Sequence, residues 1–155
     1  MQSISVKLGT QSYPIFIHTT GLSNIGSLVS ERKLGNRAAV ISDETVSKLY
    51  SDRVIKSLEK AGINSFLHIV PNGENSKSLN ILSEIYTDII KRGLKRDDMI
   101  IALGGGVVGD IAGFAAATYL RGVNFVQIPT TLLAQVDSSV AVSYTHLRAH
   151  ETSLH

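Results

Sequence analysis

Apolar and polar positions recur along the chain with two different periods, which predict strands and helices in a regular order. The chain starts with two short extended runs, Ser3 to Lys7 and Tyr13 to His18, and a segment containing Gly9 joins them. This spacing is typical of two antiparallel strands connected by a turn. The sequence therefore predicts a β-hairpin at the amino terminus.

Beyond this hairpin, short apolar runs alternate with stretches of helical period. Strands are expected at 37–41, 65–70, 99–103 and 123–128. The first helical stretch starts at Leu22, and three longer helices are expected between the four strands. Strands that alternate with helices of this length indicate the α/β class, here a Rossmann-like parallel sheet with helices on both faces.

Two glycines mark the expected ends of the first two longer helices. Asp43 precedes the first of them and Gly62 closes it, and Gly93 closes the second. The apolar face of the first is expected to contain Val46, Leu49, Tyr50, Ile55 and Leu58. The third starts at a glycine-rich loop and runs to about Tyr119.

Composition narrows the class of protein. Apolar residues make up 43% of the 155 and charged residues 18%, which is enough for one folded domain with a core. The net charge of +2 is small and scattered, so nucleic-acid and membrane surfaces are not expected as partners. The chain has no cysteine, no secretory start and no apolar run of membrane-spanning length. A soluble, cytoplasmic protein is expected.

The glycine-rich loop at 103–110, L-G-G-G-V-V-G-D, follows a buried-type strand and opens a helix. Gly104, Gly106 and Gly109 satisfy the G-x-G-x-x-G spacing, which lets a pyrophosphate approach backbone amides at a helix amino terminus. A tight turn with close helix packing would require the same glycines. The motif predicts a dinucleotide-phosphate site but does not exclude the turn.

Other candidate ligand residues follow the ends of the expected strands. The acid that an ordinary Rossmann dehydrogenase carries about 20 residues after this loop is absent, so that class is disfavoured. Asp43 is placed either to accept hydrogen bonds from a ribose or to cap a helix. Carboxyl ends of parallel strands share one edge, so one cleft is expected to collect Asp43, Glu74, Lys77, Gly105 and Thr130.

Two further residues remain open on their own chemistry. Arg121 follows a helix, where arginine is usually a solvated cap, although its planar fork can also bind phosphate or carboxylate. Asp137 lies where a helical face gives way to polar residues, so it is either a helix end or a cleft residue.

Three segments taken together resemble the 3-dehydroquinate synthase family. They are P-N-G-E-N-S-K-S-L at 71–79, A-L-G-G-G-V-V-G-D-I-A-G-F-A-A-A-T-Y-L-R-G at 102–122, and I-P-T-T-L-L-A-Q-V-D-S-S-V at 128–140. They occur in the family's order and spacing. The resemblance covers residues 1–140, which we assign as the family's NAD-binding α/β domain.

The resemblance implies an enzyme of the shikimate pathway. The family is a phosphorus-oxygen lyase that converts 3-deoxy-D-arabino-heptulosonate 7-phosphate to 3-dehydroquinate and phosphate, with bound NAD and a divalent metal, zinc or cobalt. By similarity, Arg121 and Asp137 would face the sugar phosphate. The residues that would hold NAD are Asp43, Glu74, Asn75, Ser76, Lys77, Gly105, Gly106, Val107, Asp110, Thr130 and Thr131.

The resemblance ends after Val140. Ser143 stands where the family has a substrate-binding lysine, and residues 141–155 resemble nothing in the family. We interpret this tail as vector-derived and disordered, and its histidines, His146 and His150 among them, as no metal site. The family's metal ligands belong to a helical second domain that is absent from this sequence.

These observations predict a fragment with a sugar phosphate as its small-molecule partner and without turnover of its own, because no catalytic set is complete. The alternatives are a stand-alone NAD-binding module or another sugar-phosphate cyclase. Glycerol-dehydrogenase-like enzymes share the architecture as well. The resemblance is also compatible with a homodimer of the full-length enzyme.

Overall fold

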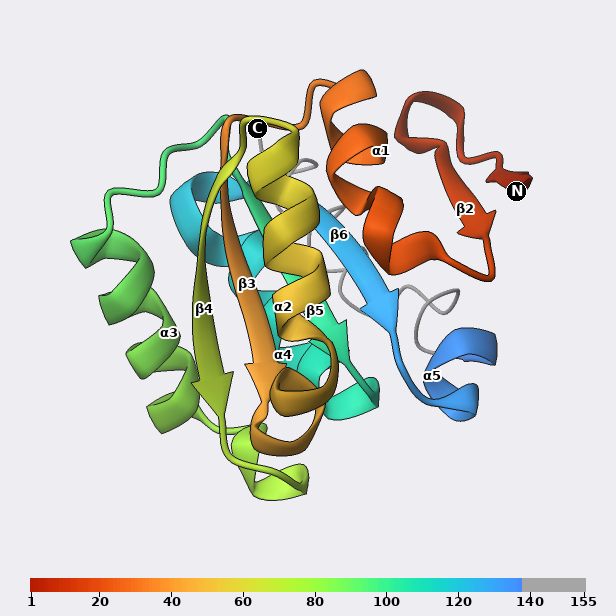
Figure 1. The fold of residues 1–155 in the computed structure, drawn as a ribbon. Coiled ribbons are helices and arrows are strands. Elements are labelled where there is room, and N and C mark those ends of the chain that lie inside the picture. The colour runs from red at the N-terminus through yellow and green to blue at the C-terminus, as the bar shows by residue number, and fades with distance from the viewer. Residues whose placement is uncertain (138–155) are drawn as a thin grey trace.

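The fold is a three-layer α/β sandwich with a separate hairpin, as a computed structural model shows for residues 1–137 (Figure 1). The central sheet contains β3 (Arg37–Asp43), β4 (Asn64–Val70), β5 (Met99–Gly104) and β6 (Asn124–Pro129). The helices are α1 (Ile25–Glu31), α2 (Glu44–Lys60), α3 (Leu79–Lys91), α4 (Gly106–Thr118) and α5 (Leu132–Val136). The predicted fold class is confirmed. None of these helices is long and apolar enough to cross a membrane.

The hairpin consists of β1 (Gln2–Val6) and β2 (Tyr13–Ile17), which pair antiparallel with Val6 opposite Tyr13. A single 3-10 turn, Gly9–Gln11, lies in the connection, and Gly9 has the positive φ of +63° that this turn requires. The hairpin predicted from the spacing of the two extended runs is therefore confirmed. It forms a sheet of its own and does not extend the parallel sheet.

The parallel sheet has the strand order β4-β3-β5-β6. From β3 the chain moves outward to β4, then returns across β3 to form β5 on its other side. Crossovers between parallel strands are right-handed, so a reversal of direction moves the connecting helix to the opposite face. In Figure 1 α2 accordingly lies in front of the sheet and α4 behind it.

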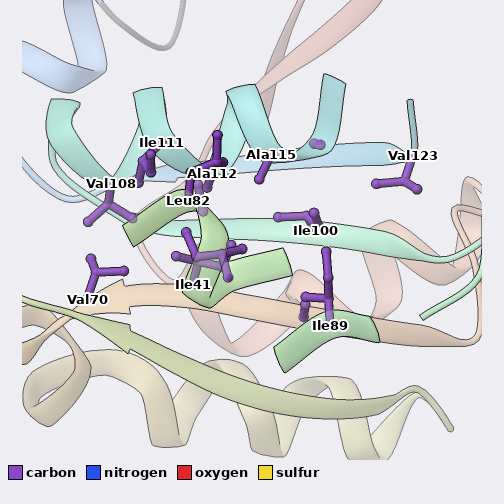
Figure 2. Close-up of a cluster of buried hydrophobic side chains, with 14 of the residues drawn as sticks. Ile41, Val70, Leu82, Ile89, Ile100, Val108, Ile111, Ala112, Ala115 and Val123 are labelled. Carbon is purple, nitrogen blue, oxygen red and sulfur yellow. The ribbon is translucent and has the colours of Figure 1, made fainter. Parts of the chain in front are cut away.

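Each face of the sheet has its own hydrophobic core. Behind the sheet, Ile41 and Ile100 pack with residues of α3 and α4, such as Ile85 and Ala112, and Figure 2 shows part of this cluster. In front, Val40 and the other alternate residues of β3 and β5 pack against α1 and α2. Both faces of β3 and β5 are buried, so β5 is apolar throughout and β3 is apolar from Ala38 to Ile41, as expected for central strands of a parallel sheet.

The buried face of α2 matches the predicted one at Leu58, Val46 and Tyr50 but differs at Leu49. Val54 and Leu58 are buried, but Leu49 is 62% exposed. Buried serines complete the face instead, among them Ser51, whose hydroxyl donates to the Ser47 carbonyl at 2.6 Å. A serine that donates to the preceding turn hides its polar group within the helix, so apolar spacing alone misplaced the stripe. The predicted closing glycines are confirmed, since Gly62 and Gly93 have φ of +76° and +69°.

A close contact between backbones joins α1 to α2. The Gly26 amide donates to Ser57 Oγ at 3.0 Å, and the same hydroxyl donates to the Ser23 carbonyl at 2.9 Å. A Cβ atom added at Gly26 would lie 2.0 Å from the Ser57 carbonyl oxygen, far inside van der Waals contact. Glycine is therefore required here by proximity, since α1 could not approach α2 this closely with any side chain.

A charged cluster ties the edge strand β4 to α3. Asp88 Oδ2 lies 2.8 Å from His68 Nδ1, and Arg92 Nε donates to Asp88 Oδ1 at 3.0 Å. The Arg92 guanidinium also covers the Phe66 ring, 4.6 Å from its centroid. Burial acts to raise the pKa of Asp88, but the hydrogen bonds from His68 and Arg92 hold this pKa below its ordinary value of 3.8.

We expect Asp88→Asn to lower the free energy of unfolding at neutral pH by about 1 kcal/mol, because it removes both charge-assisted bonds. A lowered folded-state pKa stabilises the fold above the unfolded-state pKa, and this contribution is lost as the pH falls below 3.8. The difference between Asp88→Asn and the parent should therefore shrink in acid, measured by urea unfolding at a series of pH values. Glu84→Gln, on an exposed position of α3, is the control. A difference that persists unchanged in acid would contradict this assignment.

Candidate functional site

The four parallel strands end at one edge of the sheet (Figure 1), and the predicted cofactor residues belong to these strand ends or to the segments that follow them. Asp43 ends β3, Gly104 ends β5, and Thr130 follows β6. The connections leave β3 and β5 toward opposite faces, so this is the switch point at which an open α/β sheet forms a crevice. The prediction that these strand ends share an edge is confirmed.

Asp43 caps α2. Its Oδ1 accepts hydrogen bonds from the amides of Thr45 at 2.9 Å and Val46 at 2.8 Å. The structure thus shows the helix-capping role that the sequence left open. Within residues 1–137 the other oxygen, Oδ2, has no hydrogen bond, so the carboxylate can cap the helix and still accept from a ligand.

Other elements bind the carbonyl groups of the glycine-rich loop. Leu103 O accepts from Ser42 Oγ at 2.7 Å, and Gly104 O accepts from the Thr130 amide at 2.9 Å. Gly105 O accepts from the Gly109 amide at 3.0 Å, inside the first turn of α4. Because these carbonyls are satisfied, the chemistry that the loop can offer to a ligand is that of its N–H groups.

The amino terminus of α4 is open to an anion. The first four amides of an α-helix have no partner inside the helix, and they carry the positive end of its dipole. Side chains cap α2, α3 and α5, whereas Gly105 at the N-cap of α4 has none with which to do so. A Cβ atom at Gly105 would lie 3.1 Å from Thr131 Cγ2. The turn is therefore both tight and uncapped, which fits a pyrophosphate.

Lys77 and Asp110 connect the loop after β4 to α4. Lys77 Nζ lies 2.8 Å from Asp110 Oδ2 and 3.3 Å from Glu74 Oε2. The hydrogen bond to Asp110 raises the pKa of Lys77 above 10.5, burial acts against this rise, and Glu74 adds to it. The ion pair therefore stabilises the fold below pH 10.5 and weakens as the pH rises above the raised pKa. Lys77 is a fixed positive charge beside the crevice at any physiological pH.

The loop between β4 and α3 is held by its own polar groups. The buried Ser76 donates through Oγ to the Pro71 carbonyl, and Gly73 takes a φ of +96°. Asn72 Nδ2 donates to Thr45 Oγ1 at 3.1 Å, which links this loop to the start of α2. Asn75 is exposed. Of the predicted cofactor residues here, the Ser76 hydroxyl is thus engaged in shaping the loop.

The two threonines after β6 differ in their bonding. Thr131 caps α5, because its Oγ1 accepts from the Ala134 amide at 3.1 Å. Thr130 Oγ1 is buried and has no hydrogen-bond partner among the described residues. A buried hydroxyl without a partner is costly, so a ligand atom that paired with it would remove the penalty. This orphaned hydroxyl, next to the uncapped helix, is a second feature that fits a bound cofactor.

Arg121 and Asp137 lie apart from this group. Arg121 stands between α4 and β6, at the opposite edge of the sheet, and it is exposed. Leu120 and Arg121 both take positive φ, 48° and 66°, an uncommon pair for residues with side chains. Asp137 follows the last turn of α5, on the edge that holds the crevice. Only Asp137 therefore shares an edge with the predicted cofactor residues.

The described residues do not offer a metal site. No group of three or more histidine, aspartate or glutamate side chains within residues 1–137 is placed to hold an ion. The predictions for residues 138–155, including the tail histidines, lie outside the described residues. The residues present thus fit a dinucleotide and do not fit a divalent metal.

Sequence reasoning overlooked two residues that shape the crevice. Ser42 is completely buried and binds the carbonyl that precedes the glycine-rich loop. Asn72 links the loop after β4 to the start of α2 at the same edge. For the first, a serine directly after the apolar run at 37–41 was a usable signal, because a buried strand rarely carries an unpaired hydroxyl.

Comparisons with known proteins agree with this geometry. The sequence family described as 3-dehydroquinate synthase N-terminal matches residues 67–145. The 3-dehydroquinate synthase of Desulforamulus reducens is 51% identical over 150 residues, which are 96% of this chain and 42% of that protein. The chain spans about two fifths of the length of the curated relatives that it matches.

Solved structures of related cyclases share the fold. A 2-deoxy-scyllo-inosose synthase complexed with carbaglucose-6-phosphate, NAD+ and Co2+ superimposes with a TM-score of 0.80 and 25% identity, over 91% of this chain and 38% of that one. The 2-epi-5-epi-valiolone synthase of Streptomyces hygroscopicus, with NAD+ and Zn2+ bound, has a TM-score of 0.61 and 31% identity, over 66% and 29%.

Proposed function

Because this chain belongs to the 3-dehydroquinate synthase family, we propose that it forms the NAD-binding part of an enzyme that makes 3-dehydroquinate. The substrate would be 3-deoxy-D-arabino-heptulosonate 7-phosphate, and phosphate would be released. The observation that carries the proposal is the uncapped amino terminus of α4, preceded by a loop whose carbonyls are bound elsewhere. The 51% identity to a 3-dehydroquinate synthase favours this reaction over that of the cyclase matched at 25%.

Each part of the crevice would hold a different part of NAD. The amides of Gly105, Gly106 and Val107 would bind the pyrophosphate. Asp43 Oδ2 would accept from a ribose hydroxyl, and the Thr130 hydroxyl would gain the partner that it lacks within residues 1–137. The remaining proposed cofactor contacts are Glu74, Asn75, Ser76, Lys77, Asp110 and Thr131.

When bound, NAD would supply hydride-transfer chemistry, taking a hydride from the carbon that bears a substrate hydroxyl and returning it later in the same turnover. This chain's residues would hold it in one orientation at the strand ends. Lys77, fixed by Asp110, would supply a positive charge there without giving up its proton. The metal would be held by ligands outside the described residues.

The proposal also includes a substrate role for two residues, a cellular location, an oligomeric state and a division into domains. Asp137, at the crevice edge, would contact the sugar phosphate. For Arg121 this role rests on the resemblance, since the residue lies at the opposite edge of the sheet from the crevice. We also propose a cytoplasmic location, a homodimer in the full-length enzyme, and the division into a domain at 1–140 and a non-family tail at 141–155.

We expect the chain to bind NAD, and the binding should stabilise it against unfolding. At a ligand concentration about 100 times the Kd, the free energy of unfolding should rise by about 2.7 kcal/mol. Thermal unfolding with increasing NAD would show this as a progressive rise in Tm, and isothermal titration calorimetry would give the Kd.

The variant Asp43→Ser tests the proposed ribose contact separately from the helix cap. Serine is as good an N-cap as aspartate, so α2 should keep its cap, while the carboxylate oxygen proposed for the ribose is removed. We expect NAD affinity to fall by about tenfold with little change in the Tm of the free protein. Absence of any NAD-dependent change in the parent chain would exclude the proposed function.

Turnover is tested separately. We expect the chain alone to release no phosphate from 3-deoxy-D-arabino-heptulosonate 7-phosphate. A chimera in which residues 138–155 are replaced by the remainder of the Desulforamulus reducens enzyme should release phosphate in the presence of NAD and Co2+ or Zn2+. Release that required NAD and was lost in the Asp43→Ser chimera would support the assignment.

A further inference from the structure

Ser42 lies where the pairing of β3 with β5 ends and the chain leaves the two strands toward opposite faces of the sheet. It is the last residue of β3 paired with β5, opposite Leu103, and its side chain is completely buried. Its Oγ donates to the Leu103 carbonyl at 2.7 Å. After this pair, β3 continues into Asp43 and α2, and β5 continues into Gly104 and α4 on the opposite face.

A hydroxyl is an uncommon choice at this position. The preceding strand residues, Ala38 to Ile41, are all apolar and fully buried. An apolar side chain would fill the site without the desolvation that a hydroxyl incurs. The hydroxyl is satisfied only because it reaches across to β5, so its contribution must come from that bond.

The bond holds the peptide group that leads into the glycine-rich loop. Three consecutive carbonyls, at Leu103, Gly104 and Gly105, are each bound by a different element. The Gly104 carbonyl is held by a backbone amide and the Gly105 carbonyl by α4 itself. Ser42 and Leu103 are also paired in the parallel ladder between β3 and β5, and the Ser42 side chain adds its own bond at the Leu103 carbonyl, so this carbonyl differs from the other two in receiving a side-chain hydroxyl that substitution can remove.

We propose that Ser42 is a positioning residue for the cofactor, and that its bond to the Leu103 carbonyl sets the distance between the Asp43 carboxylate and the amides of α4. The inference rests on the proposed function. Asp43 is the next residue after Ser42, and Gly104 is the next after Leu103. A change in the separation of Ser42 and Leu103 therefore passes directly to the two groups that would hold the ribose and the pyrophosphate.

The experiment compares Ser42→Thr with Ser42→Val. These side chains have nearly the same shape, and only threonine keeps the hydroxyl, so their difference reports the bond and not the added methyl group. Ser51→Ala is the control, because Ser51 is also a buried serine of this region that donates to a carbonyl. For each variant the Kd for NAD is measured by calorimetry and the stability by urea unfolding.

We expect Ser42→Val to bind NAD roughly three- to tenfold more weakly than Ser42→Thr, the range that one net hydrogen bond spans. Ser51→Ala should keep the parent Kd, because its hydroxyl bonds within α2 and not to β5. Equal affinities for the valine and threonine variants would overturn the inference and leave the proposed function intact, because a purely structural bond changes stability and not the affinity of the folded protein. A parent chain that does not bind NAD would overturn both.

Discussion

Replacing Gly26 with alanine is expected to lower the free energy of unfolding by about 3 kcal/mol or more. The new Cβ atom would lie 2.0 Å from the Ser57 carbonyl oxygen and 2.6 Å from the carbonyl carbon. Both are backbone atoms of α2, so no side chain can move to make room. Relief requires α1 to separate from α2, which would also break the buried bond from the Gly26 amide to Ser57 Oγ.

Gly21→Ala is the matched control for this prediction. It lies in the segment just before α1, where an added Cβ would meet its nearest neighbour, His18 Cβ, at an ordinary 3.5 Å. The same change in composition should therefore alter stability by less than about 1 kcal/mol. Urea unfolding followed by circular dichroism measures both variants. Similar midpoints for the two would show that α1 does not pack against α2 in this way.

Gly104→Ala is expected to weaken NAD binding by about 100-fold, provided that the proposed function is correct. A Cβ atom at Gly104 would lie 2.7 Å from both Cβ and Cγ2 of Val108. Val108 is 1% exposed and packs in the core behind the sheet, so it cannot turn aside freely. The first turn of α4 would have to shift, and its amides with it, by a large part of an ångström.

Gly105→Ala gives an internal comparison. Its Cβ atom would meet Thr131 Cγ2 at 3.1 Å, the far end of an exposed side chain. A small rotation of that threonine relieves the contact, so we expect a loss of affinity well below that of Gly104→Ala. Calorimetric titration with NAD at a temperature where each variant is folded separates affinity from stability. The reverse order would argue against the loop and the start of α4 as the phosphate site.

The sequence predicted the elements well because each is dominated by local patterns. The apolar runs at 37–41 and 99–103 lie within β3 and β5, and Gly62 and Gly93 follow the ends of α2 and α3. Leu49 shows where this reasoning stops. Its spacing fits the helix face, but buried serines that bond to their own helix fill that face, and Leu49 is left in solvent.

The candidate site was predictable as far as it follows strand ends. Asp43 ends a recognisable strand, Gly105 and Thr130 each follow one, and parallel strands bring such positions to one edge. Arg121 belongs to no strand end, and only the path of α4 places it at the other edge. The bond from Ser42 to Leu103 joins residues 61 positions apart, so a local pattern could mark the serine but could not identify its partner.

We could infer from the sequence alone the α/β class, the opening hairpin, the glycine-rich loop and the family, because hydrophobic period, turn residues and motifs are properties of neighbouring positions. Three features emerged with the folded structure: the strand order, the close contact of Gly26 with α2, and which polar groups are satisfied. Those features depend on which surfaces meet, and that is settled by packing and hydrogen bonding between segments far apart in the chain.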